Sequence, residues 1–138
     1  MQLARLCVVY DKRVAERDAL CHVLIIEDEA LIALDLENIL AGEGASSFSF
    51  AASQSEAIEN ARSRPPAFIT SDVTLLDGTG PAAVKAIRTA MGVIPVAYIS
   101  AQTADWGQGH CKTRSLRKPL DRIAIIAAFH ELRDLHGA

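Results

Sequence analysis

The sequence predicts a three-layer α/β fold, in which helices cover both faces of a doubly wound, parallel, five-stranded sheet. From about residue 22 onward, five short apolar runs alternate with helix-like stretches, and parallel neighbouring strands need crossover connections of this kind. His22–Ile26 forms a continuous apolar run, which is typical of a strand buried on both faces. The chain of 138 residues has the length of one domain.

The first helix follows this strand. Ala30–Leu40 consists of helix formers with apolar side chains at helical spacing, and Gly42 and Gly44 end it. Phe48–Ala52 is a weaker and more polar candidate for the second strand.

The middle of the chain continues the alternation. Ser53 or Ser55 is expected to cap a helix that ends before Pro65, because the residue before a proline disfavours helical backbone. The third strand is predicted at Ala67–Ser71, and Asp72 follows directly at its carboxyl end.

The last third contains the remaining elements. Pro81 suits the first turn of a helix over Ala82–Ala90. Strands are predicted at Ile94–Ile99 and at Thr113–Leu116, and a final helix at Asp121–His136.

Composition and charge exclude several classes of protein. An apolar fraction of 50% with a formal net charge of -3 excludes a disordered chain. Seventeen acidic against fourteen basic residues leave no cationic excess for nucleic acid, so no nucleic-acid partner is expected. No apolar run approaches the roughly 20 residues that span a bilayer. Arg5 and Asp11–Arg13 exclude a signal peptide, and we therefore expect a cytoplasmic protein.

The predicted strand ends carry a set of polar side chains. In an open α/β sheet, ligands bind beyond the carboxyl ends of the strands. Clustered carboxylates repel one another unless a cation joins them, and a hard ion such as Mg²⁺ prefers oxygen ligands. Each acid alone would be an ordinary loop carboxylate, but together they predict a magnesium site. The side chains at the strand ends are those of Glu27, Asp28, Asp72, Ser100 and Lys118.

Four short motifs occur in an order and spacing that identify a family. They are Ile25–Glu29, Ser71–Gly78, Ile99–Ala101 and Lys118-Pro119, and Asp72 lies 44 positions after Asp28. Together they resemble the receiver domain of bacterial two-component response regulators. The resemblance covers residues 20–138 and implies the flavodoxin-like form of the doubly wound fold, which leaves residues 1–19 as an N-terminal extension.

The resemblance implies roles in phosphoryl transfer. Asp72 matches the phosphoacceptor, whose carboxylate attacks the phosphohistidine of a sensor histidine kinase or a histidine phosphotransfer protein. Ser100 matches the hydroxyl that hydrogen-bonds the phosphoryl oxygens, and Lys118 matches the lysine that pairs with them. The bond from Lys118 to Pro119 is often cis in this family. Phosphoryl transfer needs in-line positioning and neutralised charge, which these side chains suit.

The same resemblance implies a set of magnesium ligands. Asp28 matches the principal ligand, and Glu27 acts directly or through a water molecule. The carboxylate of Asp72 and the carbonyl of Thr74 would complete the set.

We expect no output domain after the predicted receiver, and therefore a stand-alone regulator. Its signal would pass through protein–protein contacts in a phosphorelay. It would not be an enzyme beyond its own phosphorylation and dephosphorylation at Asp72.

Two departures from the family pattern concern the switching machinery. The position three residues before Lys118 usually holds an aromatic residue and here holds Ser115. Tyr98 and Trp106 are the nearby aromatics, and we expect Tyr98 to belong to the core. The segment between Ser100 and Lys118 is short for the family, and residues 102–110 within it contain two glycines, so a short or disordered fourth helix is expected.

The final helix carries more apolar residues than one stripe. A helix packed on one face of a sheet needs about 100° of apolar surface. We therefore expect Ile125 or Phe129 to be exposed and to form a homodimer interface. The alternative is a wider core contact with the N-terminal extension. Residues 1–19 would otherwise be a flexible or partly helical extension, or a dimerising arm.

Two alternative functions remain open. One is a receiver-like interaction module that is not phosphorylated in the cell, which the absence of the aromatic at Ser115 favours. The other is a phosphatase of the haloacid dehalogenase type with Asp72 as nucleophile. That class needs a second acid two residues later to protonate the leaving group, and Thr74 cannot serve.

Overall fold

The computed structural model describes residues 21–102 and 112–137. The predictions made for residues 1–19, for Trp106 and for the fourth helix lie outside these residues. The described strands are β1 (His22–Ile26), β2 (Ser47–Ala51), β3 (Phe68–Asp72), β4 (Val96–Ser100) and β5 (Thr113–Arg117). The described helices are α2 (Ala30–Ala41), α3 (Gln54–Ser63), α4 (Gly80–Met91) and α5 (Arg122–Gly137).

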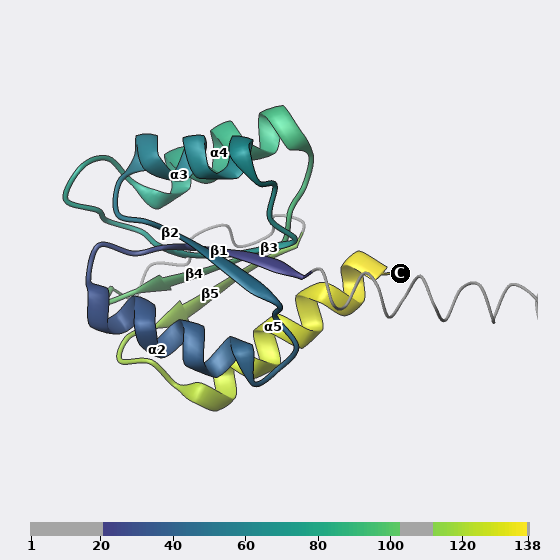
Figure 1. Ribbon diagram of the computed structural model, residues 1–138. Coiled ribbons are helices and arrows are strands. Elements are labelled where there is room, and N and C mark those ends of the chain that lie inside the picture. Colours follow the sequence, from purple (N-terminus) through teal and green to yellow (C-terminus); the bar gives the residue numbers. More distant parts are fainter. Residues whose placement is uncertain (1–20, 103–111, 138) are drawn as a thin grey trace, which may run out of the picture.

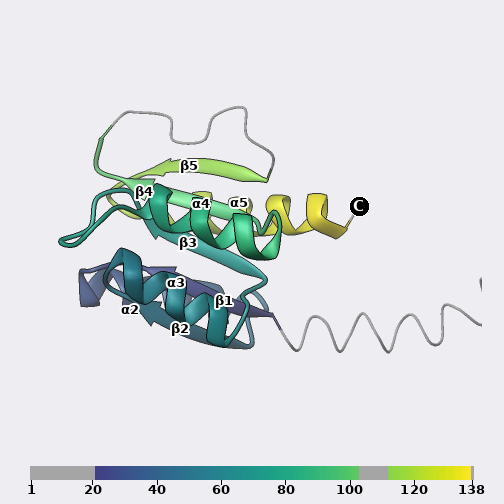
Figure 2. The ribbon, with the colours of Figure 1, turned by 90° about the horizontal axis from the view of Figure 1, so that it is seen from above.

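The five strands form one parallel sheet in the order β2-β1-β3-β4-β5. Helices α3 and α4 cover one face of this sheet, and α2 and α5 cover the other (Figure 1). Figure 2, which looks down on α3 and α4, shows β5 at one edge of the sheet. The prediction of a three-layer, doubly wound α/β fold is therefore confirmed.

Strand positions agree with the sequence to within two residues. The largest difference is β4, which begins at Val96 and not at Ile94. The carbonyl of Ile94 instead accepts two hydrogen bonds from the Arg88 guanidinium of α4, at 3.1 and 2.9 Å. The Ile94 carbonyl thus bonds to the Arg88 side chain of α4 before the strand begins.

The helix ends follow local side-chain chemistry. The Ser53 hydroxyl caps α3 by accepting the backbone N–H of Glu56 at 3.2 Å. The Thr79 hydroxyl caps α4 by accepting the N–H of Ala82 at 3.2 Å. Such caps satisfy backbone donors that have no partner within the helix. Because α3 and α4 start directly after β2 and the β3–α4 loop, both caps fix chain segments at the carboxyl edge of the sheet.

Each face of the sheet buries one hydrophobic cluster. The cluster under α3 and α4 includes Leu24, Ile69 and Tyr98, and Tyr98 is only 6% exposed. The cluster under α2 and α5 includes Phe68 and Phe129. The expectation that Tyr98 belongs to the core is confirmed.

The expectation of an exposed Ile125 or Phe129 was wrong. Ile125 is 3% exposed and Phe129 is fully buried. Helix α5 packs against α2 as well as against β4 and β5, so a wider stripe of the helix is covered than one sheet contact requires. The Phe129 ring meets Phe68 edge to face at 5.0 Å between centroids. Neither side chain is therefore available on the surface to form the predicted homodimer interface.

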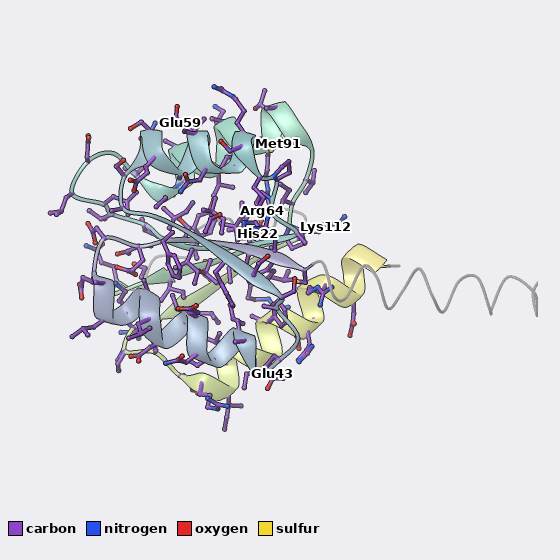
Figure 3. The ribbon with its side chains drawn as sticks, in the orientation of Figure 1. His22, Glu43, Glu59, Arg64, Met91 and Lys112 are labelled. Carbon is purple, nitrogen blue, oxygen red and sulfur yellow. The ribbon has the colours of Figure 1, made fainter. Side chains whose placement is uncertain are left out.

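A polar network surrounds the buried His22 at the amino edge of the sheet. Both ring nitrogens of His22 are hydrogen-bonded, Nδ1 to the Ser47 hydroxyl at 2.8 Å and Nε2 to the Ser49 hydroxyl at 2.7 Å. The Arg64 guanidinium donates to the same Ser47 hydroxyl at 2.9 Å. Figure 3 shows His22 and Arg64 at this end of the molecule. Burial, together with the Arg64 charge, lowers the pKa of His22.

Among the described residues, no helix combines the length and apolarity that a bilayer crossing requires.

Candidate functional site

Glu27 follows β1 and is buried at the carboxyl edge of the sheet, 5% exposed. Its backbone N–H donates to the carbonyl of Ala51 at 2.9 Å, which extends the β1–β2 pairing by one residue. One carboxylate oxygen, Oε2, accepts the N–H of Glu29 at 3.1 Å. The other, Oε1, is buried without a hydrogen-bond partner among the described residues, and its near neighbour is the Lys118 ammonium at 3.5 Å. A buried carboxylate oxygen in this condition is poised for a cationic ligand.

Asp72 is the last residue of β3, the central strand of the sheet. Its Oδ1 accepts the N–H of Val73 at 2.8 Å, and its Oδ2 accepts from the Lys118 ammonium at 3.1 Å. The Asp72 side chain is 11% exposed and that of Lys118 is 16% exposed. The carboxylate is therefore oriented by two donors and still reaches solvent.

Asp28 connects β1 to the loop between β3 and α4. Its Oδ2 accepts the backbone N–H of Leu76 at 2.7 Å. Oxygen atoms of Glu27, Asp28 and Asp72 all lie within 4.8 Å of one another. The structure thus brings together the three carboxylates that the sequence predicts at one site.

Thr74 and Ser100 border this cluster. Thr74 is exposed in the β3–α4 loop, where it forms an isolated antiparallel bridge with Thr79. Ser100 is buried at the end of β4, and its hydroxyl accepts the N–H of Gln102 at 3.0 Å. The Ser100 carbonyl accepts the N–H of Lys118 at 2.8 Å, and the Lys118-Pro119 peptide is cis. Ser100 is therefore tied to Lys118 through the backbone.

The β3–α4 loop is held by two features that the sequence did not indicate. Gln54, the first residue of α3, donates its N–H to the carbonyl of Asp77 at 3.0 Å and accepts the N–H of Thr79 at 3.1 Å on its side-chain oxygen. Gly80 lies so close to Asp72 that an added Cβ would sit 1.9 Å from the Asp72 carbonyl oxygen. The only sequence signal was the Asp77-Gly78 turn, which marks a loop but not its contacts.

Two pKa shifts follow from crowding these charges. Burial, reinforced by the Asp72 charge, raises the pKa of Glu27 to about 7. Burial alone would lower the pKa of Lys118, but the hydrogen bond to Asp72 and the charge of Glu27 outweigh it and raise that pKa. Lys118 is therefore a permanent cation, and Glu27 is a carboxylate whose ionisation depends on nearby positive charge.

The donor set fits a magnesium ion. Three carboxylates supply hard oxygen ligands within a few ångströms, as Mg²⁺ prefers. Oε1 of Glu27 is buried, has no hydrogen-bond partner among the described residues and faces the Lys118 ammonium at 3.5 Å, which favours a metal here over a purely structural acid cluster.

Comparison with known proteins decides the family. Residues 23–129 match the family model described as the response regulator receiver domain. The chain belongs to this family. Over 86 residues, 61% of its length, it is 40% identical to the phyllosphere-induced regulator PhyR of Methylorubrum extorquens. That match covers 32% of PhyR, so the chain spans less than half of this relative.

Solved structures of receiver domains have the same architecture. A response regulator receiver protein of Sinorhizobium medicae superposes with a TM-score of 0.74 at 25% identity, covering 83% of this chain and 95% of the other. The receiver domain of the PhyR response regulator of Erythrobacter litoralis gives a TM-score of 0.72 at 25% identity, covering 83% and 91%.

This receiver domain differs from the usual pattern on β5. Ser115 lies in register with Tyr98 of β4, and Tyr98 is part of the core cluster under α3 and α4. The aromatic side chain near Ser100 is therefore Tyr98, which lies on the same strand, β4, and is buried, whereas β5 carries the hydroxyl of Ser115 at the position in register with it.

Proposed function

We propose that the protein is a phosphoryl acceptor in two-component signalling and that Asp72 receives the phosphoryl group from a histidine kinase or a histidine phosphotransfer protein. The observation that carries this proposal is the contact of the Asp72 carboxylate with the Lys118 ammonium at 3.1 Å, beside the oxygens of Glu27 and Asp28. Membership of the receiver family supports it.

The proposed step is an in-line displacement at phosphorus. A carboxylate oxygen of Asp72 forms the new O–P bond while the P–N bond to the donor histidine breaks, and the leaving imidazole keeps the electron pair and takes up a proton. The Val73 N–H and the Lys118 ammonium hold the carboxylate in place for this attack. The product is an acyl phosphate at the edge of the sheet.

Charge on the transferred group is neutralised from two sides. When bound, Mg²⁺ supplies positive charge to the phosphoryl oxygens, held by Glu27, Asp28 and Asp72 with the carbonyl of Thr74. On the other side, the Lys118 ammonium pairs with a phosphoryl oxygen, and the Ser100 hydroxyl, which accepts the Gln102 N–H in the unphosphorylated protein, donates its proton to a phosphoryl oxygen. Movement of Ser100 then reports phosphorylation to the surface.

The proposed output is protein–protein contact without further enzymatic chemistry. Residues 20–138 form the signalling domain in this proposal, and residues 1–19 are an extension to it. Self-dephosphorylation at Asp72 would end the signal.

Exposed apolar side chains surround the acceptor and suit a protein donor. Leu31 in the first turn of α2 is 78% exposed, Leu76 in the β3–α4 loop is 92% exposed, and Ile123 in the first turn of α5 is 78% exposed. All three follow the carboxyl ends of strands, so they border the edge at which Asp72 lies. Exposed apolar side chains around a charged site indicate a protein interface, because contact between apolar surface and water is unfavourable and a partner protein would remove it.

Docking of the phosphohistidine protein on the surface formed by Leu31, Leu76 and Ile123 can be tested directly. Leu76→Asp should slow phosphoryl transfer from a phosphohistidine protein about tenfold and leave transfer from acetyl phosphate unchanged. Val93→Asp is the matched control, because Val93 is 48% exposed but lies between α4 and β4 at the opposite edge of the sheet. Equal transfer rates from the protein donor for the two variants would refute this docking face.

The acceptor itself is tested by intact mass spectrometry after incubation with acetyl phosphate and Mg²⁺. The wild-type chain should gain one phosphoryl group, whereas Asp72→Asn should gain none. Asp77→Asn is the control, because Asp77 is exposed in the same loop. Labelling of Asp72→Asn at the wild-type level would exclude Asp72, and absence of labelling in the wild type would favour an unphosphorylated interaction module.

A further inference from the structure

Gln54, the first residue of α3, is attached to the loop between β3 and α4 at two points. Its backbone N–H donates to the carbonyl of Asp77 at 3.0 Å, and its side-chain oxygen Oε1 accepts the N–H of Thr79 at 3.1 Å. Gly78 lies between these contacts, and a Cβ added to it would sit 2.4 Å from the Cβ of Gln54. The stem of the Gln54 side chain therefore packs on Gly78, and its amide ends at Thr79.

Thr79 is paired across the loop with Thr74, whose carbonyl is a proposed metal ligand. Backbone hydrogen bonds flank this pair on both sides, at 3.3 Å from the N–H of Leu75 to the carbonyl of Gly78 and at 2.9 Å from the N–H of Gly80 to that of Val73. This is the pattern of a non-hydrogen-bonded antiparallel pair, in which each residue directs its own N–H and C=O groups away from the other. The N–H of Thr79 is thus directed to Gln54, and the carbonyl of Thr74 is directed to the opposite side of the loop.

The tip of this loop is held by polar contacts. Residues 76–79 are all exposed, so burial contributes little to their position. One attachment is the hydrogen bond from the Leu76 N–H to Oδ2 of Asp28 at 2.7 Å, but Asp28 is itself a proposed ligand of the ion. The other attachment is Gln54, which is not one of the three clustered acids. Gln54 is therefore the anchor for which the ion does not compete.

We propose that Gln54 is a positioning residue of the metal site. Its side-chain oxygen holds Thr79, and through the pair of Thr79 with Thr74 it fixes the Thr74 carbonyl for Mg²⁺. Mg²⁺ requires nearly ideal octahedral geometry, so a ligand on a loose loop weakens its binding. A ligand that is already held in place loses less conformational entropy when the ion binds. This inference rests on the metal-dependent acceptor function proposed for Asp72.

The test is calorimetric titration of the full, metal-free chain with Mg²⁺. Gln54→Met keeps an unbranched stem to pack on Gly78 but removes the acceptor for Thr79, and it should weaken Mg²⁺ binding about threefold to tenfold. Asn60→Ala is the matched control, because it removes another amide hydrogen bond of α3, from Nδ2 of Asn60 to the carbonyl of Phe50 at 2.7 Å. This control should bind Mg²⁺ like the wild type.

Amide hydrogen exchange of the metal-free protein measures the positioning contact itself. The Thr79 N–H should exchange faster in Gln54→Met than in the wild type, whereas Gln54→Glu, which again offers an acceptor oxygen, should restore slow exchange. Unchanged Thr79 exchange in Gln54→Met, or equal Mg²⁺ affinities of Gln54→Met and Asn60→Ala, would overturn the role of Gln54 while leaving Asp72 as acceptor. Absence of Mg²⁺ binding in the wild type would overturn both the metal site and this role.

Discussion

The two edges of the sheet differ in how completely their buried polar side chains are hydrogen-bonded. At the amino edge, both nitrogens of His22 are hydrogen-bonded to serine hydroxyls on the neighbouring strand. At the carboxyl edge, Oε1 of Glu27 is buried without a hydrogen bond among the described residues. Only an ion pair with Lys118 at 3.5 Å balances it, and the carboxylate of Asp72 lies in the same cluster. A satisfied network stabilises the fold, whereas an unsatisfied one raises the free energy of the folded protein until a ligand completes it. The difference assigns a structural role to one edge and a binding role to the other.

The largest expected effect concerns the amino edge. His22→Ala should lower the free energy of unfolding by about 2–3 kcal/mol, because two hydrogen bonds and a buried ring are lost. Mg²⁺ affinity should stay within twofold of the wild type, since His22 is at the opposite end of β1 from Glu27. Urea denaturation and calorimetry measure the two quantities. His130→Ala is the control, because His130 pairs with Glu43 on the surface. Equal destabilisation by both variants would contradict the structural role of His22.

Glu27→Gln should raise the free energy of unfolding and lower Mg²⁺ affinity, in contrast to His22→Ala. Without Mg²⁺ and above pH 7, the free energy of unfolding should rise by about 1 kcal/mol, because a buried charge and its repulsion by Asp72 are removed. Mg²⁺ affinity should fall about tenfold, since a carboxylate ligand is replaced by a neutral amide. Glu59→Gln, on the exposed surface of α3, should change neither quantity. A Glu27→Gln protein that is less stable than the wild type would show that this carboxylate is structural.

Thr70→Val measures the cost of a buried hydroxyl without a hydrogen bond at a position between the two edges. Thr70 is fully buried in the middle of β3, and its hydroxyl has no hydrogen-bond partner among the described residues. Replacing this hydroxyl by a methyl group should raise the free energy of unfolding by about 1 kcal/mol and leave Mg²⁺ binding unchanged. Thr89→Val is the control at an exposed position on α4. A loss of stability in Thr70→Val alone would reveal a polar partner for the hydroxyl.

The smallest effect is the pH dependence, in which the two edges should differ in sign. The pKa of His22 is lowered in the folded protein, so the unfolded chain binds its proton more tightly, and the stability that His22 provides is lost as pH falls below about 6.5. The pKa of Glu27 is raised to about 7 in the metal-free protein, so its contribution falls as pH rises from 4.5 to about 7.

Urea denaturation of the metal-free variants across this pH range separates the two terms. The difference in unfolding free energy between wild type and His22→Ala should grow with rising pH. The unfolding free energy of the wild type minus that of Glu27→Gln should fall with rising pH, from near zero at acid pH to about -1 kcal/mol above pH 7. Slopes of the same sign in both differences would contradict the assignment of the two groups.

Much of this site could be predicted from the sequence because its residues sit at strand ends. Once the apolar runs fix the strands, parallel pairing brings Glu27, Asp28 and Asp72 to one edge without further information. The order of the motifs also identifies the family. Helical positions of Ala30–Leu40 and the strand at His22–Ile26 depend only on local patterns, and the structure agrees with both.

The remainder depends on contacts between distant segments. The burial of Ile125 and Phe129 requires α2 to pack beside α5, which no local pattern of α5 contains. The His22 network requires the register of β1 with β2, which places Ser47 opposite His22. In the sequence, His22 is only the first residue of an apolar run. The serines at alternate positions of β2 were the signal that could have indicated a polar partner on the same face.

The most direct test of the difference between the two edges is to locate a bound ion. Mn²⁺ takes oxygen ligands like Mg²⁺ and broadens the NMR signals of nuclei near it. On titration into the isotopically labelled chain, the amide signals of Asp28, Asp72 and Thr74 should broaden first, while those of His22 and Ser47 stay sharp. Broadening that begins at the amino edge, or that is spread evenly over the acidic surface, would contradict a metal site at the Glu27 carboxylate.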